Sequence, residues 1–239
     1  MNLTHFKALI LDLYGTVLDR ESGIFEGLRP LIDRSNRDVT QTEALDIYNR
    51  HELAQMRDTP TLEHHNLLPV VYKRVADEWR VPAPWAECIA FGLSTRNWPI
   101  YGDAPGALQY LKKFYKLVVL SDIDTESFAR LKAELPVEFD AVFTAGNVET
   151  STPFSSNLGS VIEMLAAGHV EHAEALRIVG RPLDPHGAAI DLDLATCSIL
   201  RVPAYGRQAM DRELGVGADA LCFDSMADFV RSHQDALRL

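Results

Sequence analysis

The chain has 239 residues and a formal net charge of −11 at pH 7, because 34 acidic side chains outnumber 23 lysines and arginines. This length suits one large domain or a core with a smaller insert. The 47% hydrophobic and 24% charged residues are typical of a globular chain. The acidic balance argues against nucleic-acid binding and against docking on an anionic membrane, since both need a basic face. A small-molecule partner is therefore expected.

The sequence shows no sign of a membrane, secretory or metal-binding protein. No apolar run approaches the ~20 residues of a transmembrane helix, and the first residues lack the pattern of a signal peptide. The three cysteines, Cys88, Cys197 and Cys222, have no CxxC spacing, so neither a disulfide framework nor a zinc site is predicted. We expect a cytoplasmic protein without a metal ion or other cofactor.

Short apolar runs of strand type alternate with helical patterns along most of the chain. The expected strands cover 7–11, 116–120, 141–144, 176–179, 197–200 and 220–223, and the expected helices cover 104–114, 126–134, 158–167 and 226–234. This alternation predicts the α/β class, with a parallel sheet covered by helices on both faces. Ligands of such sheets bind at the carboxyl ends of the strands.

Residues 16–98 interrupt the alternation. They contain helical patterns over 25–32, 41–56, 63–79 and 84–91 and no convincing strand. We interpret them as a helical cap domain inserted after the first strand, and residues 1–15 and 99–239 as the core domain. A cap at the ligand end of the sheet is expected to act as a lid.

The residues after the first strand suggest a family. The segment DLYGTVLD at 12–19, together with LQYLKKFYKLVVLSDID at 108–124, EFDAVFTAGNV at 138–148 and FDSMADFVRSHQ at 223–234, resembles the haloacid dehalogenase superfamily. Within it, the chain is most similar to the type II 2-haloacid dehalogenases, over nearly its whole length. The resemblance implies a Rossmann-like core with a helical cap after the first strand, and a possible homodimer.

The resemblance also implies catalytic roles. A carboxylate at a strand end can attack an electrophilic carbon and form an ester, and Asp12 holds that position. The phosphatase branch carries a second Asp two residues later and uses magnesium, whereas this chain has Tyr14, as in the metal-independent branch. Thr16 is expected to donate a hydrogen bond to the Asp12 carboxylate, and Ser121 to the reacting group.

Three positions depart from the family pattern. The lysine expected before a proline is Thr152, and no lysine follows Lys132. The small polar residues and the aspartate of the fourth motif are replaced by a stretch containing Arg181 and His186. Asp122 stands where the family has Asn after Ser121. Arg181 and His186 are candidates for the missing positive charge and for substrate binding.

These departures shift the expected chemistry. Loss of a cation and gain of a neighbouring carboxylate both raise the pKa of Asp12. We therefore expect Asp12, with Asp122 nearby, to act as a general acid in a non-hydrolytic reaction, such as epoxide rearrangement or cyclisation of a specialised metabolite. The alternatives are a hydrolytic 2-haloacid dehalogenase with Asp12 as nucleophile and a binding protein without catalysis.

The remaining candidates for substrate contact are spread over both predicted domains. They are Arg50 in the second cap helix, Trp98 at the end of the cap, and Phe154 and Leu158 after Thr152, where they make the site more apolar. The pair His64-His65 is expected at the surface, and the run from Asp33 to Thr42 is expected to be a loop that ends in a helix N-cap.

Overall fold

The computed structural model describes residues 2–59, 62–145, 154–180, 194–201 and 221–238. A parallel six-stranded sheet forms the core, in the order β3-β2-β1-β4-β5-β6. The strands are β1 (Ala8–Leu11), β2 (Lys116–Asp124), β3 (Ala141–Ala145), β4 (Ala175–Val179), β5 (Thr196–Ile199) and β6 (Leu221–Phe223). This confirms the predicted fold class.

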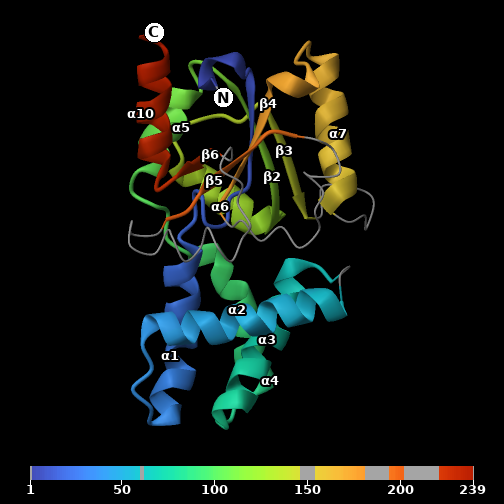
Figure 1. The fold of residues 1–239 in the computed structure, drawn as a ribbon. Coiled ribbons are helices and arrows are strands. Elements are labelled where there is room, and N and C mark those ends of the chain that lie inside the picture. The colour runs from blue at the N-terminus through green and yellow to red at the C-terminus, as the bar shows by residue number, and fades with distance from the viewer. Residues whose placement is uncertain (1, 60–61, 146–153, 181–193, 202–220, 239) are drawn as a thin grey trace.

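Helices pack on both faces of the sheet (Figure 1). On one side lie α5 (Ala104–Leu111), α6 (Thr125–Glu134) and α10 (Met226–Ala236), and on the other lies α7 (Phe154–Ala167); short 3₁₀ turns, η1 (Leu3–His5) and η3 (His172–Glu174), precede β1 and β4. Alternate residues of β1 divide between two apolar layers. Leu9 packs with the α5 and α10 side, and Ile10 packs with the α7 side. Burial on both faces explains why the strands read as continuous apolar runs.

The region between β1 and β2 is helical in the described residues. It contains α1 (Arg20–Ser35), α2 (Gln41–Asp58), α3 (His64–Trp79), α4 (Trp85–Leu93) and η2 (Ser94–Asn97), which we call the cap. Thr40 forms a capping box with Glu43 at the start of α2, as expected for the preceding polar loop. In Figure 1 the cap lies beyond the end of the sheet toward which the arrows of β2 and β3 point. The division into a core and a cap domain at residues 15 and 99 remains a prediction.

Two short segments carry the chain between the core and the cap, and they are hydrogen-bonded to each other. Leu18 and Ile100 form an antiparallel bridge. Tyr101 N–H donates to the Val17 carbonyl at 2.9 Å, and Asp19 N–H donates to the Pro99 carbonyl at 2.7 Å. The residues that follow the first strand are thereby held at the base of the cap.

The second strand is longer than predicted. β2 continues past Leu120 to Asp124, with an irregular register between Ser121 and Asp124, because its polar last residues still pair with β3. Ser121 is consequently buried inside the strand, whereas Asp122 is exposed. Among the described residues, no helix is long and apolar enough to cross a bilayer.

Candidate active site

Asp12 lies directly after β1, where its backbone still belongs to the sheet. Its N–H donates to the Ile178 carbonyl at 2.9 Å. The side-chain oxygen Oδ1 accepts hydrogen bonds from Ser121 Oγ at 2.9 Å and from the Leu13 N–H at 2.7 Å. Ser121 thus contacts the Asp12 carboxyl, which brings together two of the residues singled out in the sequence.

Thr16 does not make the contact expected of it. Its hydroxyl donates to the main-chain carbonyl of Asp12, not to the carboxylate. The reason is the tight turn after β1, in which Val17 and Leu18 N–H groups both donate to the Leu13 carbonyl. Thr16 therefore fixes the backbone that carries Asp12 and leaves the carboxylate to Ser121 and Leu13.

The electrostatic surroundings of Asp12 raise its pKa from 3.8 to about 6. Burial is the largest cause, because it penalises the charged form, and the neighbouring Asp122 carboxylate adds to it. The Ser121 hydrogen bond, the positive charge of Arg177 and the Leu13 N–H act in the opposite direction. As expected from the sequence, Asp122 raises the pKa of Asp12, and the Asp12 carboxyl titrates close to neutral pH.

A close approach of two glycines shapes the turn after Asp12. Gly15 has a φ of 80°, in the left-handed region that favours glycine. A Cβ atom built on Gly180, at the end of β4, would lie 2.2 Å from the Gly15 carbonyl carbon. The two backbones therefore touch where the β1 and β4 loops meet, and only glycine at position 180 permits this.

Tyr14 is buried between aromatic rings of the cap. Its ring centroid lies 5.5 Å from that of Trp98 and 5.0 Å from that of His64. Burial and nearby carboxylates, Asp124 foremost, raise the pKa of the Tyr14 phenol well above its usual range. The phenol therefore keeps its proton, which suits a hydrogen-bond donor better than a metal ligand.

His64 is not a surface residue, contrary to expectation. Its side chain is 13% exposed, and its Nε2 lies 3.7 Å from Glu52 Oε1. Glu52 in turn forms a buried ion pair with Arg20 at 2.6 Å. The start of α3 packs against β2, so this charged group of the cap lies behind Tyr14. His65 has a 41% exposed side chain, as predicted.

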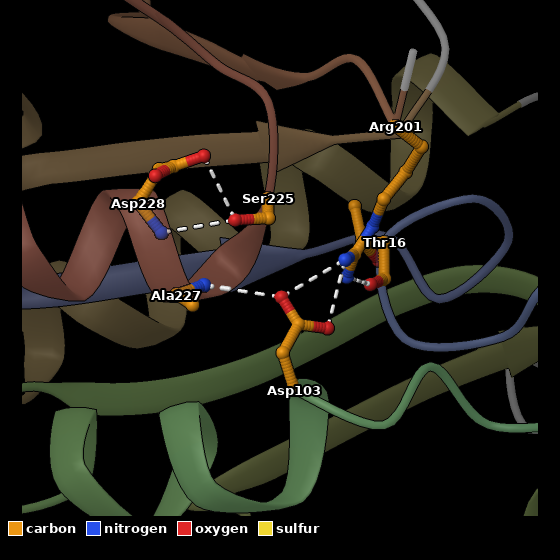
Figure 2. A network of polar contacts seen from close by, with 6 residues as sticks. All are labelled: Thr16, Asp103, Arg201, Ser225, Ala227 and Asp228. Carbon is orange, nitrogen blue, oxygen red and sulfur yellow. Dashed lines mark hydrogen bonds and ion pairs between the residues drawn. The ribbon is translucent and has the colours of Figure 1, made fainter. Parts of the chain in front are cut away.

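Arg201 joins the turn after Asp12 to the rest of the core (Figure 2). Its guanidinium donates to both carboxylate oxygens of Asp103 and to the Thr16 carbonyl, and it stacks 3.9 Å from the centre of the Tyr101 ring. Asp103 also accepts from the Ala227 N–H at 3.1 Å. Arg201 therefore connects the ends of β5, α5 and α10 to the turn that follows Asp12.

Two predicted contact residues have surroundings of their own in the structure. Arg50 is exposed on α2 and pairs with Glu78 at 2.8 Å, because the opposite face of α2 is the buried one. Its role in substrate binding stays a prediction. Leu158 is fully buried in the apolar layer beneath α7, with Ile10 among its cluster, so it is a core residue.

The other predicted contact residues differ in how much the structure describes of them. Phe154 is the first residue of α7. Thr152, Arg181 and His186 lie outside the described residues. Trp98 is buried beside Tyr14, and its Nε1 donates to Ser94 Oγ at 3.3 Å. Within the described part of the chain, no three His, Cys, Asp or Glu side chains gather in a way that could hold a metal ion.

Sequence reasoning overlooked Arg177 and Arg201. Arg177 is the single charged residue in the run LRIV of β4, and it is 5% exposed. A cation inside a strand that is otherwise apolar is a signal that the sequence already contained, because buried charges need a partner. Arg201 comes shortly after the apolar run of β5. Its partners, Asp103 and Thr16, are distant in sequence, so no local pattern indicates them.

Likeness to known proteins is found among solved structures. No family model matches the chain, and no curated protein does. Among solved structures, an L-2-haloacid dehalogenase from Xanthobacter autotrophicus has a TM-score of 0.72 and 17% identity, covering 95% of this chain and 97% of that one. The same enzyme with chloropropionic acid covalently bound has a TM-score of 0.69 and 18% identity, with the same coverage.

Two further neighbours extend the likeness. A defluorinating L-2-haloacid dehalogenase has a TM-score of 0.71 and 16% identity, covering 96% of this chain and 95% of the other. A putative HAD-hydrolase from Bacillus subtilis, bound to magnesium, has a TM-score of 0.66 and 13% identity, covering 95% and 98%. The likeness therefore extends over nearly the full length of each chain. The protein therefore has the fold of these solved structures, the L-2-haloacid dehalogenases among them.

Proposed function

We propose that this protein is an enzyme in which the Asp12 carboxylate attacks a small organic acid that carries a leaving group, as in 2-haloacids. The observation that carries the proposal is the pair of donors on Asp12 Oδ1, from Ser121 at 2.9 Å and Leu13 N–H at 2.7 Å. Both favour the charged carboxylate over the acid. Among the described residues, the hydrogen bonds to this carboxyl all end on Oδ1, which leaves Oδ2 for the reaction.

The proposed reaction has two steps. Asp12 Oδ2 forms a bond to the substrate carbon while the carbon–halogen bond breaks, and the halide leaves with the bonding electrons. The product of this step is an ester on Asp12. Water then adds to the ester carbonyl and cleaves its acyl–oxygen bond, which regenerates the carboxylate, releases a hydroxy acid and gives one proton to solvent.

Two further features support this proposal. Solved structures with the same fold are L-2-haloacid dehalogenases, one of them with chloropropionic acid covalently bound. In addition, the buried phenol of Tyr14 stands where the phosphatase branch carries a second carboxylate, which favours chemistry without magnesium. The cap is the expected lid, and a cytoplasmic homodimer remains part of the proposal on the resemblance alone.

A second candidate is non-hydrolytic acid catalysis by Asp12, which the sequence had favoured. The observation in its favour is the pKa of about 6, which keeps a fraction of the carboxyl protonated near neutral pH. Epoxide opening or cyclisation of a small metabolite is the corresponding reaction. We place it second because both hydrogen-bond donors on Oδ1 stabilise the anion and no comparison favours an isomerase.

The two candidates predict opposite pH dependence. Halide release from a panel of 2-chloro and 2-bromo acids is measured between about pH 5 and pH 8, with Asp12→Asn as the inactive control. The nucleophilic proposal expects rates that rise as pH passes about 6, and a substrate-derived ester on the Asp12 peptide in mass spectra of quenched enzyme. Turnover that survives Asp12→Asn would refute both candidates, and turnover of an epoxide that falls as pH rises would favour the acid.

A further inference from the structure

Arg177 lies on β4, the strand that pairs with β1 just before Asp12. β1 and β4 pair in parallel with Ile10 opposite Arg177, and paired residues of parallel strands project to the same side. Since side chains alternate along a strand and the Asp12 N–H still pairs with the Ile178 carbonyl of β4, we expect Asp12 to project to the side of Ile10. One strand spacing and two residues of rise separate the two Cα atoms by roughly 8 Å, which a long arginine side chain can span.

The burial of Arg177 is unusual in its surroundings. It is 5% exposed, and the same face of the sheet carries the apolar cluster that contains Ile10, Val118 and Leu158. A guanidinium in such a layer is expected only where an opposite charge is close. Arg20, the other buried arginine among the described residues, is paired with Glu52 in the cap, whereas the charge of Arg177 acts on the Asp12 carboxyl.

We propose that Arg177 is the positioning residue that holds the Asp12 carboxylate in its charged form from the neighbouring strand. The inference rests on the proposed function in taking Asp12 as the reacting group. It assigns to a residue of β4 the electrostatic task that the family resemblance gives to a lysine, at the position where this chain has Thr152.

Several charged and titratable groups besides Arg177 act on the Asp12 carboxyl. From β2, Ser121 donates a hydrogen bond and Asp122 adds a negative charge; from the turn, Tyr14 adds a neutral phenol. Burial and Asp122 favour the protonated acid, and Arg177 opposes them with a positive charge. Without it, a larger share of the carboxyl is expected to be protonated at neutral pH, and less of it is available as a nucleophile.

The test is a titration of Asp12 that needs no substrate. Protein labelled with [4-¹³C]aspartate is titrated by NMR, and the Asp12 signal is assigned by its absence in Asp12→Asn. In Arg177→Met the midpoint of Asp12 is expected to rise by about 1 pH unit or more, as when a nearby opposite charge is removed. Arg177→Lys keeps the charge and is expected to restore most of the original midpoint.

Arg20→Met is the matched control, because it removes the other buried cation but is not among the charges acting on Asp12. It is expected to leave the Asp12 midpoint unchanged. A midpoint that stays the same in Arg177→Met, or that moves equally in Arg177→Met and Arg177→Lys, overturns the inference. Because the titration is independent of halide release, failure of the proposed reaction and failure of this inference are separate results.

A double-mutant cycle covers the case in which Arg177→Met folds poorly. If Arg177 serves Asp12, the change to Met is expected to lower the melting temperature less in an Asp12→Asn background than in the native chain. Equal losses in the two backgrounds would show that Arg177 does not act on Asp12.

Discussion

Arg201 and Asp103 form a two-pronged ion pair, with distances of 2.7 and 2.9 Å from one guanidinium nitrogen to the two carboxylate oxygens (Figure 2). The same guanidinium donates to the carbonyl of Thr16, four residues after Asp12. Arg201 has a φ of 57°, an uncommon value for a residue other than glycine. Arg201, two residues after β5, is thus held in a left-handed conformation, and its side chain contacts the turn that follows Asp12.

Removal of this guanidinium is expected to destabilise the core. Arg201→Met leaves the partly buried Asp103 without its cation and the Thr16 carbonyl without its donor, at a cost of about 3 kcal/mol. Urea denaturation measures the loss. Arg231→Met is the matched control, because Arg231 is an exposed partner of Asp228 and is expected to change stability by less than about 1 kcal/mol. Equal losses for the two variants would contradict the role of Arg201.

The contact between Gly15 and Gly180 predicts a strong effect of one methyl group. Gly180→Ala places Cβ 2.2 Å from the Gly15 carbonyl carbon, so a backbone must move, at a cost of about 2 kcal/mol or more. Gly106→Ala is the control, since a Cβ there meets nothing within 4 Å and the residue is inside α5. It is expected to stabilise the chain by about 0.5–1 kcal/mol. Similar melting temperatures for both variants would refute the close approach.

Asp12→Asn is expected to make the protein more stable at neutral pH. The carboxyl titrates near pH 6 in the folded state and near its ordinary 3.8 when unfolded, so the folded state binds its proton more tightly. Stability due to this group is therefore complete below about pH 4 and is lost as pH rises through 6. Removing the charge is expected to recover up to about 3 kcal/mol at pH 8.

Denaturation curves at about pH 8 and pH 4.5 test this expectation. The gain in Asp12→Asn is expected to be large at the higher pH and small at the lower one. A gain of the same size at both pH values, or a loss at pH 8, would mean that Asp12 is not a strained buried charge.

Neighbouring substitutions on β2 are expected to move the Asp12 titration in opposite directions. Ser121→Ala removes a donor to Oδ1 and is expected to raise the pKa of Asp12 above about 6, whereas Asp122→Asn removes a repelling charge and is expected to lower it. The midpoint of the pH–rate profile, or of the NMR titration, gives both shifts. Shifts of the same sign would show that these residues act on the fold and not on the charge of Asp12.

Local patterns predicted most of the fold. The six apolar runs became the six strands of the parallel sheet, and the helical patterns between β1 and β2 became the cap. This succeeded because a strand buried on both faces must be apolar along its length, and a helix on a core must be amphipathic. The extension of β2 beyond Leu120 was not foreseen, because polar residues at a strand end carry no such pattern.

The sequence determined the central residue of the site and its nearest partner: the motif at 12–19 singled out Asp12, and the end of the second apolar run singled out Ser121, which donates to Asp12 at 2.9 Å. Tertiary structure alone decided the rest. Thr16 donates to a backbone carbonyl, Arg50 is exposed on α2, and the half-buried His64 lies against Tyr14. The physical reason is that packing between segments far apart in the chain decides which side chains meet. The pairing of β1 with β4, which brings Arg177 beside β1, is an example. A local sequence pattern does not contain such a pairing.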